Sequence, residues 1–346
     1  MTSLSDTEPT SSVPFTVSES AFKSPDGINL AYTKYCSSLQ SSSSPHKVVC
    51  FHGWLDNAAT FNKLAPALLT KSNVEIYCVD FPGHGKSSHK SMDSPSLMAD
   101  YIYYAVEFIS FVQNGNQTKL IIIGHSMGSG VASIVASVYP DLISRLVMLE
   151  GVGPLSRPAS DILQTLRKST DKRQSGNRFL TNPNGKGPRV YESLEAAVQQ
   201  RCRTAELSPG TQTLSYDAAL AMVSRATIPS GTSGGVSFIH DPRLAWPSVM
   251  YLTTEMIETL IANIKVPTLI IGGDNGWPIP ADDRARRLKV FTEDRGEGDG
   301  TFQHEVVEGS HHLHLDEGKG LEDCKRFVVE FLEAGWFENE VYKSKM

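Results

Sequence analysis

The sequence lacks the features that mark secreted, nucleic-acid-binding and membrane-spanning proteins. Its 346 residues include only five cysteines, and none forms a Cys-x-x-Cys pair, so neither a disulfide framework nor a zinc ribbon is expected. The net charge is -6 and no block of lysine and arginine interrupts the chain, so we expect no nucleic-acid partner. No apolar run approaches the roughly 20 residues that a transmembrane helix needs.

A signal for secretion is also missing. The first basic residue is Lys23, and the stretch before it is rich in Ser and Thr and has no apolar segment. We therefore expect an intracellular protein in a reducing compartment, without a transmembrane segment. Hydrophobic residues make up 40% of the chain and charged residues 20%, a balance that provides ample material for a buried core.

Short apolar runs alternate with segments of helical period through most of the chain. The apolar runs span 47–51, 74–80, 120–123, 146–149, 268–272 and 302–307. The helical segments span 59–69, 97–112, 127–138, 281–288 and 321–332. Two further β-leaning runs between residues 15 and 35 flank a Ser-Pro-Asp-Gly turn and predict a hairpin. Apolar strands that alternate with helices predict an α/β fold with a mostly parallel sheet covered on both faces.

The alternation stops between residues 155 and 265, where amphipathic helical segments occur instead. These segments span 160–168, 193–206, 215–225 and 254–264. We therefore predict a core formed by residues 15–154 and 266–337, with residues 155–265 inserted as a helical cap. Residues 1–14 are predicted to be a disordered tail, because they have too little apolar surface to offset the entropy of ordering, and residues 338–346 a polar C-terminal tail.

A Gly-x-Ser-x-Gly motif, Gly124 to Gly128, directly follows one of the apolar runs. A segment rich in small residues comes next, and this strand–turn–helix context is the one that a nucleophile elbow requires. The Oγ atom of Ser126 would then stand at the end of the sheet, with a helix N-terminus behind it that favours developing negative charge. The motif predicts Ser126 as a nucleophile, and the alternative is a structural serine in a glycine-rich turn.

The segment D-F-P-G-H-G-K-S at residues 80–87 is similar to a phosphate-binding loop only superficially. The motif G-x-x-x-x-G-K-[ST] needs a glycine where Asp80 stands, so we interpret the segment as a structural loop. Arg225 and Arg243 in the predicted cap could meet a carboxylate or a phosphate, but single arginines in such a position are more often surface residues or ion-paired ones. We expect no cofactor.

These motifs together resemble the α/β-hydrolase superfamily, in which H-G, D-x-P-G-H-G and G-H-S-M-G occur in this order. Within it the chain is similar to the serine hydrolase-like proteins. The segments that carry this likeness are F-H-G-W-L-D-N at 51–57, L-E-G-V-G-P at 149–154, H-D-P-R-L at 240–244 and G-S-H-H-L-H at 309–314. The resemblance covers roughly residues 15–332 and implies an α/β-hydrolase fold with an eight-stranded sheet under the helical cap.

The resemblance implies an oxyanion hole and a base for Ser126. The turn after the run 47–51 occupies the place of the second oxyanion donor, so the backbone N–H groups of Trp54 and Met127 would hold the oxyanion. The superfamily's histidine loop reads G-x-G-H, and counting from Gly309 selects His312 as the base. His311 and His314 are the alternatives. No H-E-x-x-H motif or cysteine partner accompanies these histidines, so no metal site is expected.

The acid that orients the histidine is harder to assign. Many hydrolases of this fold carry it as G-x-x-D after the penultimate strand, but here the corresponding residue is Gly276. Glu150 follows the run 146–149, and an E-x-x-x-P pattern at this position resembles relatives such as some haloalkane dehalogenases. We favour Glu150 as the acid over Asp274.

The function implied by this resemblance is hydrolysis by a serine nucleophile. Dehalogenases and epoxide hydrolases of this fold use an aspartate where Ser126 stands, so their alkyl-enzyme route is not expected. A small-molecule carboxylic ester or thioester would instead form an acyl-enzyme that water releases. The alternative is a catalytically idle hydrolase fold used for binding, because a fold alone does not establish turnover.

The last three residues, Ser344, Lys345 and Met346, resemble the C-terminal S-K-L signal that the peroxisomal import receptor binds, with Met in place of Leu. We expect peroxisomal localisation, with the cytoplasm as the alternative. A fluorescent protein fused to the amino terminus should therefore give punctate fluorescence that is lost when residues 344–346 are deleted. A diffuse signal from the undeleted fusion would contradict the expectation.

Overall fold

The computed structural model describes residues 14–38, 45–69, 73–92, 94, 97–180, 188–210, 212–230, 234–293 and 301–343. The predicted N-terminal tail lies outside these residues except for Pro14. The predicted targeting signal at 344–346 also lies outside them. Among the described residues, no helix combines the length and the apolar character needed to cross a membrane.

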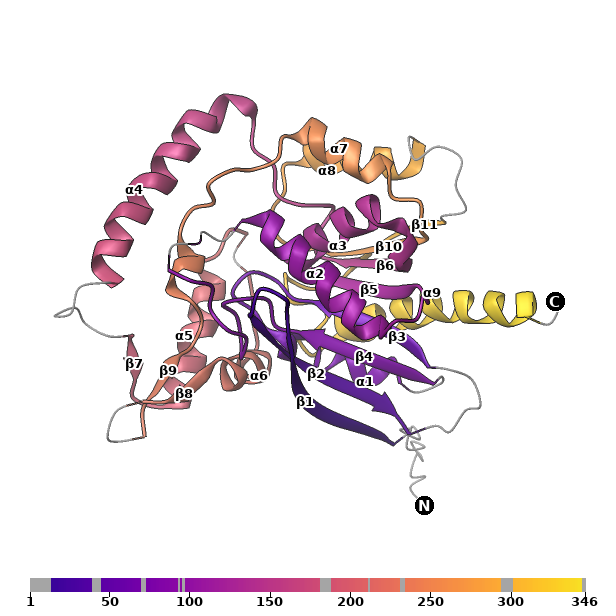
Figure 1. Cartoon of the computed structure of the whole chain (residues 1–346), viewed down its shortest axis with the longest axis horizontal. Helices are drawn as coiled ribbons and strands as arrows, with labels where there is room; N and C mark the ends of the chain where they lie inside the picture. The colour runs from indigo at the N-terminus through magenta and orange to yellow at the C-terminus, as the bar shows by residue number, and fades with distance from the viewer. Residues whose placement is uncertain are drawn as a thin grey trace, which may run out of the picture.

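An eight-stranded sheet forms the centre of the molecule (Figure 1). Its strands are β1 (Phe15–Lys23), β2 (Asn29–Ser37), β3 (His46–Phe51), β4 (Val74–Val79), β5 (Leu120–His125), β6 (Ile143–Leu149), β10 (Thr268–Gly273) and β11 (Phe302–Val307). They are ordered β1-β2-β4-β3-β5-β6-β10-β11. β2 runs antiparallel to both of its neighbours, which confirms the predicted hairpin, and the other pairs are parallel. The prediction of a mostly parallel sheet is confirmed.

Both faces of the central strands are buried, because successive side chains of a strand point to opposite faces. In β3, Val49 and Phe51 join one hydrophobic cluster, and Val48 and Cys50 join the other. The first cluster includes side chains of α2 (Met98–Gln113), α3 (Met127–Val138), α7 (Thr254–Ala262) and α8 (Ala281–Glu293). The second includes those of the 3-10 turn η1 (Ala58–Phe61), α1 (Leu64–Ala67) and α9 (Lys319–Lys343). The uninterrupted apolar runs of the sequence therefore reflect a sheet between two layers of helices.

Two helices differ from their predicted lengths. The segment 59–69, predicted as one helix, is divided into η1 and α1. Pro66 has no N–H group to donate to residue 62, so a continuous helix cannot pass through this point. The closing helix α9 reaches Lys343, beyond the predicted end at 332, and most of the predicted C-terminal tail is therefore helical.

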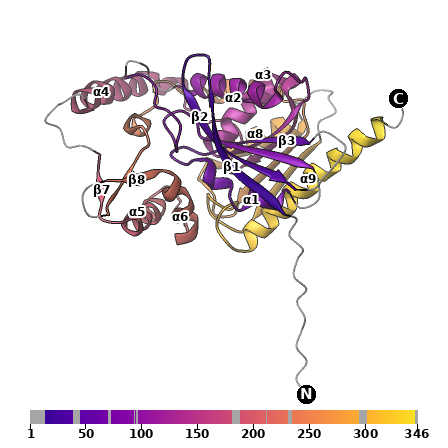
Figure 2. The ribbon, with the colours of Figure 1, turned by 60° about the horizontal axis from the view of Figure 1, so that its bottom comes forward.

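The segment between β6 and β10 contains more than helices. It holds η3 (Ala159–Asp161), α4 (Ile162–Leu180), α5 (Leu194–Glu206), α6 (Tyr216–Arg225) and η4 (Pro242–Ala245). It also forms a small antiparallel sheet of β7 (Val190–Tyr191), β8 (Thr227–Pro229) and β9 (Val236–Phe238), which the sequence analysis did not predict. Figures 1 and 2 show these elements together on one side of the large sheet, with α9 extending from the other.

Helix α7 lies within the predicted cap but packs with the core. Its residues Ile257 and Ile261 are fully buried in the cluster that includes α3 and α8. The elements that stand beside the sheet in the figures are therefore α4, α5, α6 and the small sheet.

A buried aspartate joins this inserted segment to the core. Asp80, at the end of β4, accepts hydrogen bonds from the backbone N–H groups of Ala58 (2.7 Å) and Lys86 (2.9 Å). Arg225, at the end of α6, donates its Nε–H to the same carboxylate at 3.0 Å and also pairs with Glu19. The loop 80–87 therefore surrounds a negative charge, which agrees with a structural role and opposes phosphate binding. Arg243 likewise pairs with Asp241.

We expect Asp80→Asn to lower the free energy of unfolding by about 3–5 kcal/mol, because the Arg225 guanidinium loses its buried counter-charge. Urea unfolding followed by circular dichroism measures this change. Asp141→Asn is the matched control, because the Asp141 carboxylate is fully exposed and 4.0 Å from Lys119, and no measurable change is expected there. Equal stability of the two variants would contradict the structural role of Asp80.

Candidate active site

Ser126 stands at a sharp turn between β5 and α3, as the motif predicted. Its backbone has a positive φ, with φ at +52° and ψ at -114°, which is uncommon for a residue with a side chain. A Cβ atom on Gly128 would overlap the carbonyl oxygen of Phe51, so only glycine lets α3 begin this close to β3. The turn therefore holds Ser126 at the carboxyl edge of the sheet, at the N-terminus of α3.

The side chain beside Ser126 belongs to His311. The Nε2 atom of His311 lies 2.9 Å from Ser126 Oγ, and its Nδ1 atom lies 3.0 Å from Glu150 Oε2. Serine, histidine and carboxylate thus form a continuous chain of two hydrogen bonds, drawn from the ends of β5, β11 and β6. This is the arrangement in which an imidazole can remove the proton of a serine hydroxyl.

The expected partner of Ser126, His312, does not contact it, and this prediction is wrong. His312 Nε2 lies 3.1 Å from Asp56 Oδ2, and its ring is buried. The residues after β11 form a succession of turns, in which neighbouring side chains point in different directions. The backbone N–H of His311 donates to Gln212 Oε1 at 2.9 Å, and its carbonyl accepts a hydrogen bond from His125. These two bonds fix the loop so that His311, one residue before the predicted base, faces the serine.

Glu150 lies in the place that the sequence analysis favoured, and it is held tightly there. Its carboxylate accepts the backbone N–H groups of Gly273 (2.6 Å) and Trp277 (2.8 Å) as well as His311. Burial alone would raise the pKa of Glu150, but these hydrogen bonds outweigh it and lower the pKa below its usual value. Glu150 is therefore a carboxylate at neutral pH.

Gly276, where many hydrolases of this fold carry their aspartate, leaves space for Glu150. A Cβ atom on Gly276 would overlap both carboxylate oxygens of Glu150. The competing candidate, Asp274, accepts the backbone N–H of Gly309 at 2.9 Å and so supports the histidine loop. A side chain at position 276 and the carboxylate of Glu150 would therefore occupy the same space, so only one of the two positions can carry the acid.

The candidate oxyanion donors lie at the ends of β3 and β5. Met127 is the first residue of α3, where backbone N–H groups have no acceptor within the helix. The turn that bears Trp54 is fixed by His52, whose Nε2 accepts the N–H of Phe81 while its Nδ1–H donates to Gly53. Burial lowers the pKa of His52 to about 4, so the ring is neutral at pH 7 and keeps one N–H donor and one acceptor nitrogen for these two bonds. The oxyanion role of Trp54 and Met127 stays a prediction.

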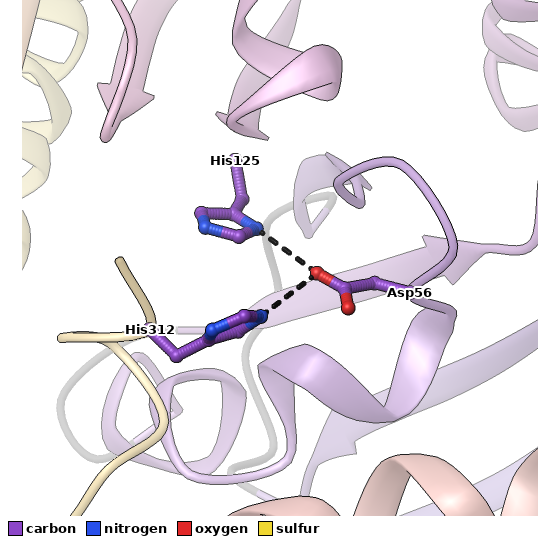
Figure 3. Close-up of side chains that lie close together, drawn as sticks. All are labelled: Asp56, His125 and His312. Atoms are coloured by element: carbon purple, nitrogen blue, oxygen red, sulfur yellow. Dashed lines mark hydrogen bonds and ion pairs between the residues drawn. The ribbon is translucent and has the colours of Figure 1, made fainter. Parts of the chain in front are cut away.

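A second group of buried polar side chains, shown in Figure 3, adjoins this site, because the ring centroids of His125 and His311 lie 4.8 Å apart. Asp56 Oδ2 lies 3.5 Å from His125 Nδ1 and 3.1 Å from His312 Nε2, and Asp56 Oδ1 lies 3.0 Å from Arg201 of α5. Among the described residues, Asp56, His125 and His312 form a group whose ligand atoms lie within 4.8 Å of one another, as a metal site requires. The Arg201 guanidinium on the same carboxylate opposes a second cation.

Sequence reasoning assigned no role to Asp56, His125, Arg201 or Gln212. Two of them stood within motifs already quoted: Asp56 in F-H-G-W-L-D-N and His125 in G-H-S-M-G. The available signal for Asp56 was a charged residue in the short turn that follows β3, the strand that ends beside Ser126. Arg201 and Gln212 come from the inserted segment, whose position relative to the sheet no local pattern encodes.

Comparison with known proteins agrees with this fold. A family model described as "alpha/beta hydrolase fold" matches residues 47–318. A serine hydrolase-like protein of Dictyostelium discoideum is 29% identical over 295 residues, which cover 83% of this chain and 76% of that protein. The human serine hydrolase-like protein 2 is 27% identical over 279 residues, covering 78% and 82%. The crystal structure of a hypothetical protein from Pseudomonas aeruginosa matches with a TM-score of 0.74 and 27% identity, over 91% of this chain and 99% of that one.

The convergence of positions 150 and 276 predicts that the acid can be moved. Glu150→Gln and Gly276→Asp should each lower kcat by orders of magnitude, the first by losing the carboxylate and the second by displacing it. Asp274→Asn, the control, should change kcat far less. Glu150→Gly combined with Gly276→Asp should recover part of the rate, measured with p-nitrophenyl esters. A double variant as slow as the worse single variant would show that the two positions are not interchangeable.

Proposed function

Because the chain belongs to the family of proteins with the alpha/beta hydrolase fold, we propose that it is a serine hydrolase that cleaves carboxylic esters or thioesters. The observation that carries this proposal is the pair of hydrogen bonds from Glu150 to His311 and from His311 to Ser126. A hydroxyl at a nucleophile elbow, a neutral imidazole and a fixed carboxylate are the groups that acyl transfer needs.

The protonation of His311 suits a general base. Burial lowers the pKa of His311 below its usual value, although the hydrogen bond with Glu150 acts in the opposite direction. The imidazole is therefore mainly neutral at pH 7. Glu150 accepts the Nδ1–H group, which leaves the lone pair of Nε2 directed at the hydroxyl of Ser126.

In the acylation step, Ser126 Oγ forms a bond to the carbonyl carbon of the substrate while its proton passes to His311 Nε2. The carbonyl oxygen becomes an oxyanion, for which the N–H groups of Met127 and Trp54 are the proposed donors. The bond from carbon to the alcohol or thiol then breaks, and the leaving group takes the proton from His311. Water repeats the sequence on the acyl-enzyme and releases the carboxylic acid.

We expect the protein to react covalently with a fluorophosphonate probe at Ser126, because the same base and oxyanion donors act on the phosphorus centre. Ser126→Ala should abolish the adduct and the hydrolysis of p-nitrophenyl esters, while circular dichroism stays unchanged. The covalent adduct is the decisive readout, because oxyanion stabilisation alone can leave weak residual turnover. A folded protein that is not labelled would instead favour a hydrolase fold used for binding.

A further inference from the structure

We propose that His125 and Asp56 are positioning residues, which hold the catalytic histidine His311 against Ser126. This inference rests on the proposed function, because it assigns a purpose to the geometry of the same site. Neither residue touches the reacting atoms, and neither is needed to complete the chain from Glu150 to Ser126.

Two consecutive residues of the elbow bind His311 at opposite ends. The hydroxyl of Ser126 meets the ring of His311 at 2.9 Å, and the Nε2–H of His125 donates to the backbone carbonyl of His311 at 2.8 Å. His125, Ser126 and His311 are thus joined in a closed loop by the peptide bond between the first two residues and by these two hydrogen bonds. The distance between nucleophile and base is therefore set by the elbow itself rather than by the length of the loop.

The other side of the His125 ring faces Asp56. A carbonyl oxygen can only accept, so His125 Nε2 carries a proton, and Nδ1 points toward Asp56 Oδ2 at 3.5 Å (Figure 3). Within the described part of the chain, His125 Nδ1 has no hydrogen-bond partner within 3.5 Å that meets the usual geometry, and it is fully buried. The Asp56 carboxylate attracts this edge of the ring when Nδ1 also carries a proton, and among the described residues Nδ1 makes no other hydrogen bond.

Asp56 is itself fixed from three elements. Burial would raise the pKa of Asp56, but His312, His125 and Arg201 outweigh it and keep the pKa well below the usual value. The Asp56 carboxylate thus stays charged in a site where only 3% of the residue is exposed. A Cβ atom on Gly53 would lie 2.9 Å from Asp56 Oδ2 and 3.0 Å from His125 Nδ1, so the backbone of Gly53 closes the remaining side.

A metal ion is the competing explanation for this group. The three ligand atoms are spaced suitably, but Arg201 already neutralises Asp56. Among the residues that the structure describes, His312 Nδ1 has no acceptor of the kind that usually orients a metal-bound imidazole. The hydrogen-bonded network accounts for the same contacts without a second cation.

A matched pair of substitutions separates the two contacts of His125. His125→Gln places an amide N–H group near the position of Nε2 and keeps the bond to the His311 carbonyl, so kcat should stay within about tenfold of the unchanged protein. In His125→Asn the shorter amide lies near the position of Nδ1, on the side of Asp56, and the bond to the His311 carbonyl is lost. We expect kcat to fall by about 100-fold with KM little changed, because His311 is displaced. His304→Gln is the control, since His304 is an exposed histidine of β11 that belongs neither to the elbow nor to the histidine loop.

The pH dependence of Asp56→Asn supplies a second readout. The charged and titratable groups facing His311 are Glu150 and Asp56, which raise its pKa, His125, which lowers it, and His312, whose ring centroid lies 5.4 Å away. Removing the charge of Asp56 should lower the pKa of His311, so the acid limb of kcat/KM should move to lower pH. A residue that only stabilised the fold would leave this limb in place.

The Nδ1–H proton of His311 gives a readout that does not require turnover. It should produce a downfield proton NMR signal, assigned by its loss in His311→Ala, that persists in His125→Gln and is broadened in His125→Asn. An unchanged signal and an unchanged kcat in folded His125→Asn would overturn the positioning role. So would loss of activity in EDTA that Zn²⁺ restores, which would make the group a metal site. Failure of the unchanged protein to react with the fluorophosphonate, with these NMR differences present, would refute only the proposed function.

Discussion

The close approach of α3 to the end of β3 is the constraint on which the rest of the site depends. Gly128 lies against the carbonyl of Phe51, and Ser126, two residues before it, makes the sharp turn with a positive φ that joins β5 to α3. The same contact brings the first N–H groups of α3 next to the turn that carries Trp54. The nucleophile and both candidate oxyanion donors are thus placed by packing of backbone on backbone, which side-chain substitutions elsewhere leave intact.

The sequence predicted the parts of the fold that local patterns encode. Buried strands of a parallel sheet are continuous apolar runs, and the elbow has its own motif, so β3, β5, α3 and Ser126 were found within a residue or two. Glu150 was identified because Gly276 left the usual position empty. The small sheet β7-β9-β8 was missed, since strands of two or three residues show no periodicity.

The error of one residue at the base has a different origin. Counting from Gly309 assumes that a loop keeps the spacing of its motif, but the direction of each side chain there depends on distant partners. Gln212 holds the backbone N–H of His311, and His125 holds its carbonyl. These partners lie 99 and 186 residues away in sequence. The residues next to a histidine in the sequence do not predict tertiary contacts of this kind.

The segment that follows α5 also binds the histidine loop. Thr213 exchanges hydrogen bonds with Ser310, and the N–H of Ser215 donates to Asp316 at 2.8 Å. Separating residues 212–215 from this loop would therefore pull His311 away from Ser126. A movement of the inserted segment that keeps His311 beside Ser126 must leave residues 212–215 in contact with the histidine loop. The parts of the segment that make none of these contacts, such as α4, are those whose displacement would leave the imidazole in place.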